Sequence, residues 1–324
     1  MTPDEAGFFR TILDHPDDDA PRLIYADWLE DRGESERAEF IRVQCELAAI
    51  RNNDVRKQEL QQREKSLYGA YSRGLEPYFR TIFPDHLICC RFDRGVPSLD
   101  LDFWKLHSLV ASVRQERAWI DLNLTLSSSY FADLARLPLL KCIVSLTCRD
   151  SVINAEEVKN LIDLASRLRL HRLHFRECDL FTADAMRVLA AWPELTRLSW
   201  LGFSFCDLTD LHVAILAQCP YLSNLRSMQL GGNHLGNRSP KLLANAASLC
   251  QLRSLGLSGD QHEFSRSGIM ALVESPTLQS LEEICCHNRY SRSSAWQRQT
   301  THLVGRFRPI TLISEENLHH YNTE

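Results

Sequence analysis

The chain has 324 residues, of which 44% are hydrophobic and 24% charged, so its composition is that of a folded globular protein and excludes a disordered or collagen-like one. The formal net charge of −5 disfavours a nucleic acid or an anionic membrane as partner, because proteins that bind these are usually basic. No stretch approaches the roughly 18 apolar residues of a membrane span, and the start of the chain is acidic where a signal peptide is basic. We therefore expect a cytoplasmic protein that contacts no membrane.

Residues 1–50 form an acidic unit with 13 acidic and 5 basic side chains. A first helix is predicted over residues 4–14, where four apolar side chains fall on one face. A second helix begins near Pro21, a residue favoured in the first turn, and ends at Gly33, a residue favoured just after the last turn. A third helix is predicted over residues 36–50. The acidic unit is therefore expected to be all-α, with three helices.

The segments Asp17–Gly33 and Arg37–Arg42 resemble the bacterial repeat-companion domain. This resemblance implies an N-terminal attachment that precedes repeats, leucine-rich repeats among them, and it implies no catalytic residues. The three adjacent aspartates Asp17–Asp19 lack the alternating spacing of a calcium loop, so we interpret them as helix-capping and solvated side chains. Residues 51–84 are predicted to form a helical linker.

A repeat of 26 to 28 residues runs through the second half of the chain. Its first part follows the pattern L-x-x-L-x-L-x-x-(N/C)-x-L, in which apolar residues alternate as they do along one face of a strand. Its second part is helical and ends with Leu followed by Ala or Val, so each repeat is predicted to be one strand and one helix. The strand parts begin at Ile143, Leu170, Leu198, Leu225, Leu252 and Leu278.

This part of the chain resembles leucine-rich repeats of the ribonuclease-inhibitor-like class. The resemblance implies an α/β fold, a leucine-rich-repeat solenoid over residues 85–288 with parallel strands on the concave side and helices on the convex side. Residues 289–324 would then form a C-terminal cap and tail.

No motif in the sequence indicates catalysis, a cofactor or a metal site. The glycines of residues 231–236 do not match a nucleotide-binding fingerprint, the HExxH and GxSxG motifs are absent, and there is no CxxC pair. We therefore expect no enzyme activity, no cofactor and no metal.

The eleven cysteines are interpreted as reduced thiols, because their number is odd and no secretory signal precedes them. Those at the (N/C) position of the repeat, such as Cys178 and Cys206, must fit inside a turn.

The side chains that alternate with the buried leucines are predicted to lie on the concave face of the sheet, where a solenoid usually contacts its partner. Aromatic and arginine side chains are enriched in interface hot spots. An alternative interpretation is that the aromatic side chains pack on their neighbours and that the arginines are merely solvated. The residues predicted to bind a partner are Arg149, Arg172, His174, Arg176, Trp200, Phe205 and Gln229.

The sequence favours a non-catalytic module that recognises another protein through this concave face. One alternative is an adaptor or sensor subunit of a bacterial defence or signalling complex whose enzyme is on another chain. A second alternative is nucleic-acid binding through residues 289–308, which carry five arginines and no acidic residue.

Overall fold

A computed structural model describes residues 3–14, 18–50, 55–82, 91–104, 121–137, 140–179, 181–258, 264–285 and 311–312. The chain divides into two compact units. The first unit comprises residues 1–123 and 137–143, and the second comprises residues 124–136 and 144–324. The domain boundaries predicted from the sequence, after residues 50, 84 and 288, stay a prediction.

The first unit consists of helices followed by a two-stranded antiparallel pair. Successive helices pack on one another, α1 on α2, α2 on α3 and α3 on α4. Strand β1 pairs with β2 through the partners Phe92 and Pro97. The elements are α1 (Pro3–Asp14), α2 (Ala20–Asp31), α3 (Ser35–Ala49), α4 (Val55–Ile82), β1 (Arg91–Asp93) and β2 (Val96–Asp102).

Aromatic rings form the centre of this unit. The ring of Phe40 on α3 stacks on Tyr71 of α4 with centroids 4.5 Å apart, and Phe92 of β1 meets Tyr71 edge-on at 4.9 Å. The turn between β1 and β2 is held by hydrogen bonds from both helices: Gly95 N donates to Gln44 Oε1 at 2.8 Å, and Tyr71 OH donates to Gly95 O at 2.6 Å. Gly95 has a φ of +84°, a conformation that favours glycine. The third helix therefore depends on residues beyond the first fifty.

The aspartates before α2 are engaged rather than merely solvated. Asp18 Oδ1 accepts a hydrogen bond from Ala20 N at 2.9 Å, whereas the side chain of Asp19, the N-cap residue of α2, makes no capping hydrogen bond. Asp19 pairs with Arg94 at 2.7 Å, so one of the acidic side chains contacts the β1–β2 turn. Asp17 lies outside the described residues.

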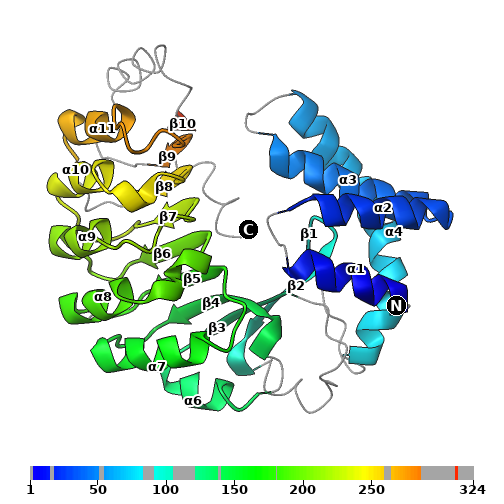
Figure 1. Cartoon of the computed structure of the whole chain (residues 1–324), viewed down its shortest axis with the longest axis horizontal. Helices are drawn as coiled ribbons and strands as arrows, with labels where there is room; N and C mark the ends of the chain where they lie inside the picture. Colours follow the sequence, from blue (N-terminus) through cyan, green and yellow to red (C-terminus); the bar gives the residue numbers. More distant parts are fainter. Residues whose placement is uncertain are drawn as a thin grey trace. The chain divides into compact units, whose positions relative to one another are not determined.

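The second unit is a series of parallel strands that alternate with helices, and β3 (Asp121–Leu126) lies across the boundary of the two units. From β4 to β10 the strands follow the order of the chain. Figure 1 shows helices α7 to α11 along one side of these strands. The strands are β4 (Ile143–Arg149), β5 (Arg172–Arg176), β6 (Trp200–Ser204), β7 (Ser227–Gln229), β8 (Ser254–Gly256), β9 (Glu283–Cys285) and β10 (Thr311–Leu312). The helices are α6 (Phe131–Leu134), α7 (Ala155–Ala165), α8 (Ala183–Ala190), α9 (Asp210–Ala217), α10 (Arg238–Ala244) and α11 (Arg266–Val273).

The mixed α/β class with mostly parallel strands is therefore confirmed. Short 3-10 segments accompany these elements at η2 (Ser128–Tyr130), η3 (Leu140–Cys142), η4 (Pro193–Arg197) and η5 (Ala247–Leu249). None of the helices within the described part of the chain has both the length and the apolar character that crossing a bilayer requires.

The register of the strands aligns equivalent positions of successive repeats. Leu173 pairs with Leu201 and Phe175 pairs with Phe203, and the two phenylalanine rings stack at 5.2 Å. These side chains are fully buried, whereas their neighbours along each strand point to the other face, because successive side chains of a strand alternate. We call this other face of strands β4 to β8 the open face.

A left-handed residue follows the strand in four successive repeats. Asp150, Glu177, Phe205 and Gly232 each stand seven residues after the predicted start of their repeat, with φ values between 49° and 72°. The backbone N–H of each donates to a carbonyl of the next repeat, as from Glu177 N to Ser204 O at 2.8 Å. The chain thus leaves strands β4 to β7 through the same turn.

The small residue one position later is buried inside this turn, at Ser151, Cys178, Cys206 and Asn233. The Cys178 thiol donates to Cys148 O at 3.2 Å, and the Cys206 thiol donates to Phe175 O at 3.3 Å. Asn233 Nδ2 donates to the equivalent carbonyl, Phe203 O, at 2.8 Å. The cysteines of the described ranges are all free thiols.

Candidate functional site

The residues predicted to bind a partner lie on or beside the open face. Arg172 and His174 stand opposite Trp200 and Gly202 across the β5–β6 pairing, and Arg176 stands opposite Ser204. Exposed side chains are those of Arg149, Arg172 and Phe205, whereas those of His174, Arg176, Trp200 and Gln229 are half-buried.

The Trp200 ring packs on neighbours from its own strand and from β5. The ring meets His174 edge-on with centroids 5.0 Å apart, and the Arg172 guanidinium carbon lies 5.3 Å from its centroid. A Cβ atom at position 202 would clash with the ring, so Gly202 leaves the space that the indole occupies. Trp200 is therefore held in place as the packing interpretation expects, and part of its surface still faces solvent.

His174 is a neutral group in the middle of this surface. Its Nε2 lies 3.0 Å from Ser204 Oγ, within hydrogen-bond distance. Burial, together with the charges of Arg176 and Arg172, lowers the pKa of His174 to about 4. The imidazole is therefore uncharged at neutral pH. It can donate or accept a hydrogen bond without adding positive charge to the open face.

We expect His174 to make stability depend on pH. An unfolded histidine takes up a proton near pH 6.5, whereas folded His174 does so near pH 4, so between these values the unfolded state binds more protons. The free energy of unfolding should therefore fall as the pH drops through this window. Urea titrations at about pH 7 and about pH 5 should show a smaller fall for His174→Gln than for the wild type. An NMR signal of His174 that titrates near 6.5 would contradict this expectation.

Two of the predicted arginines share one carboxylate. Arg149 Nη2 donates to Glu177 Oε2 at 2.9 Å, and Arg176 Nε donates to Glu177 Oε1 at 3.2 Å. The hydrogen bond from Arg149 is the main cause of the lowered pKa of Glu177. These arginines are therefore oriented by an ion pair across two repeats. Sequence reasoning missed Glu177, which occupies the left-handed turn position after β5.

Phe205 occupies the same turn position after β6 and is 58% exposed. A φ of 55° is unfavourable for a bulky residue, and Asp, Glu or Gly stands at this position in the neighbouring repeats. A Cβ atom at Gly232, the equivalent residue of the next repeat, would clash with the Phe205 ring. Residues with backbone strain of this kind cluster at functional sites, so Phe205 is a candidate contact residue.

Beyond Trp200, on β7 and β8, the open face carries mostly small side chains. Gln229 lies over Gly256, where a Cβ atom would clash with its amide group. Its Oε1 is buried and, within the described part of the chain, accepts no hydrogen bond. Ser227 and Ser254 flank it on β7 and β8. No pattern in the sequence identified the glycines that support Trp200, Phe205 and Gln229.

The remaining predictions concern metals and nucleic acid. No three His, Cys, Asp or Glu side chains of the described ranges come together in a way that could hold a metal ion. The arginines of residues 289–308, predicted as an alternative nucleic-acid site, lie outside the described residues. Comparison of the chain with protein-family models and with characterised proteins gave no match.

Proposed function

We propose that this chain is a non-catalytic protein-binding module, in which a leucine-rich-repeat solenoid recognises a partner protein through its concave face. The open face is the concave face in this proposal, and the N-terminal helices form a repeat-companion unit. Support for the repeat class comes from the recurring parallel strand, the left-handed turn residue and the small buried residue behind it. Buried free thiols in successive repeats fit a reducing compartment such as the cytoplasm.

The observation that carries the proposal is the pair of aromatic rings supported on glycines. Trp200 and Phe205 are the large apolar side chains of this surface, and each ring rests where a neighbouring residue lacks a side chain. Arg172 stands beside the indole, so a partner that covers the indole also meets a guanidinium. Pre-oriented aromatic and arginine side chains lose little entropy on binding, which favours them as interface anchors.

Replacing Trp200 with alanine should weaken partner binding by about 2 kcal/mol or more, roughly a thirtyfold loss of affinity. Proteins retained by the wild-type chain would be identified by affinity purification and mass spectrometry, and their affinity then measured by calorimetric titration. Trp104→Ala is the matched control, because Trp104 is 65% exposed and lies in the other compact unit. A partner that binds both variants as tightly as the wild type would place the interface away from the open face.

A further inference from the structure

The outer face of α9 is apolar where the neighbouring helices are charged or carry longer side chains. When the helices are aligned on the Leu-Ala or Leu-Val pair that ends each of them, Ala214 corresponds to long side chains in the other four, namely Ile162, Arg187, Lys241 and Met270. Leu211, one turn earlier, is 54% exposed and corresponds to Lys159, Asp184, Arg238 and Ser267. A surface helix normally turns polar residues to solvent, so an outer face of this kind indicates an uncovered contact surface.

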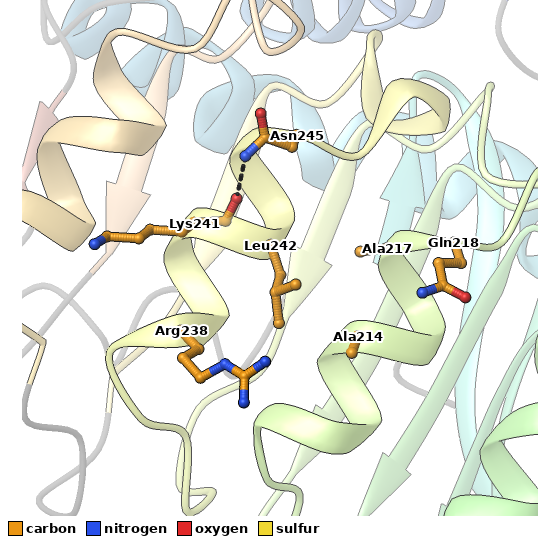
Figure 2. Close-up of a pocket in the computed structure, with 7 residues that line it drawn as sticks. All are labelled: Ala214, Ala217, Gln218, Arg238, Lys241, Leu242 and Asn245. Carbon is orange, nitrogen blue, oxygen red and sulfur yellow. Dashed lines mark hydrogen bonds between the residues drawn. The ribbon is translucent and has the colours of Figure 1, made fainter.

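A groove lies between α9 and α10 at this point. Its volume is about 380 Å³, and it is lined by Ala214, Ala217, Gln218, Arg238, Lys241, Leu242 and Asn245. The two alanines of α9 leave the space, and Figure 2 shows the Leu242 side chain pointing into it from α10. The floor of the groove is therefore apolar, and its ends carry polar groups.

The charges beside this groove are positive. Figure 2 shows the Arg238 guanidinium turned toward α9, whereas the Lys241 side chain extends to the other side of α10. Neither cationic head forms an ion pair or a hydrogen bond with any described residue. The acidic residue of α9, Asp210, is engaged elsewhere: its Oδ1 accepts from Gly236 N and Ser239 N, each at 3.0 Å, at the start of α10.

We propose that this groove is a docking site for an acidic amphipathic helix of a partner protein. Apolar side chains of such a helix, spaced at i, i+3 or i+4 and i+7, would fill the space over Ala214 and Ala217. A carboxylate beside them would pair with Arg238, whose guanidinium has no counterion among the described residues. The site is on the helical side of the repeats, so the module holds a second partner independently of the open face.

A synthetic peptide tests this proposal directly. The probe is a fluorescein-labelled helical peptide of about 18 residues, with leucines at i, i+4, i+7 and i+11 and glutamates beside them. The comparison peptide has lysine in place of every glutamate. Fluorescence anisotropy should show saturable binding of the glutamate peptide to the full chain, and binding of the lysine peptide weaker by about tenfold or more.

Variants of the chain locate the binding. Ala214→Arg fills the groove and Arg238→Glu reverses its charge, so each should weaken binding of the glutamate peptide by about tenfold. Lys241→Glu should weaken this binding less. Lys159→Glu, the same helical position on α7, and Ala48→Arg, an exposed alanine of α3, are matched controls and should bind as the wild type does. Absence of binding, equal binding of both peptides or full binding by Ala214→Arg would overturn the proposal. Self-association of the wild type that Ala214→Arg abolishes would also overturn it, because a second copy would then be the occupant.

Discussion

Replacing Asn233 with alanine is expected to lower the free energy of unfolding of the second unit by about 3 to 5 kcal/mol. Asn233 is fully buried, and its Oδ1 accepts hydrogen bonds from Cys206 N at 3.0 Å and Leu208 N at 3.2 Å. Its Nδ2 donates to Phe203 O and Leu230 O, each at 2.8 Å. Alanine would remove the acceptor of the buried Cys206 and Leu208 amides, and each buried group left unpaired costs about 1 to 3 kcal/mol.

Urea unfolding, followed by hydrogen exchange in peptides from β6 to β8, measures this effect. Asn224→Ala is the matched control, because Asn224 is exposed and donates one hydrogen bond, to Thr196 O, so its loss should cost less than about 1 kcal/mol. Asn233→Cys should fall between the two. The equivalent residues Cys178 and Cys206 show that a thiol can still donate to the preceding repeat, although it cannot supply the amide oxygen. Equal free energies of unfolding of the Asn233→Ala and Asn224→Ala chains would show that the buried hydrogen bonds do not stabilise the second unit.

Replacing Arg37 with alanine is expected to destabilise the first unit by about 3 to 5 kcal/mol, because it leaves an acidic side chain buried without its counterion. Arg37 Nη2 donates to Glu5 Oε1 at 3.1 Å and to Tyr25 OH at 3.0 Å, and its other terminal nitrogen pairs with Glu34. Glu5 is 6% exposed. The contacts join α1, α2 and α3, so their loss affects the whole helical packing.

The same unfolding measurement, read from peptides of α1 to α3, tests this second effect. Arg42→Ala is the control, because Arg42 pairs with Asp27 and Glu30 at the surface, where ion pairs contribute about 0 to 1 kcal/mol. The double variant Glu5→Met with Arg37→Met should recover much of the lost stability, because neither charge then remains buried. If Arg37→Ala lowers the free energy of unfolding no more than Arg42→Ala does, the buried network does not stabilise the first unit.

The parallel strands could be predicted because the signal is local and repeated. Leucines spaced two apart must share one face of a strand, and helical segments between them must return the chain in the same direction. Strand β4 begins at the predicted residue, Ile143, and β5 to β8 begin two residues after their predicted starts. The recurring left-handed residue was not predicted, because Asp150, Glu177, Phe205 and Gly232 share a conformation but no chemical character.

The candidate site could be predicted in part. Alternation along each strand predicts which side chains point away from the leucines, and Arg172, His174 and Trp200 follow that rule. How far each of them is covered depends on residues about 27 positions away, which the register of the sheet brings alongside. No pattern in the sequence indicates that Glu177 pairs with Arg149 or that Gly232 supports Phe205.

The sequence by itself determined the alternation of strands and helices, the residues of the buried rows and the small residues inside the turns, because each depends on spacing along the chain. The tertiary structure decided the lowered pKa of His174, the packing of Trp200 and the groove between α9 and α10. These properties arise where side chains of successive repeats meet, and burial and charge there depend on distances through space. A pattern within one repeat fixes the direction of a side chain, whereas its surroundings are fixed by the repeats beside it.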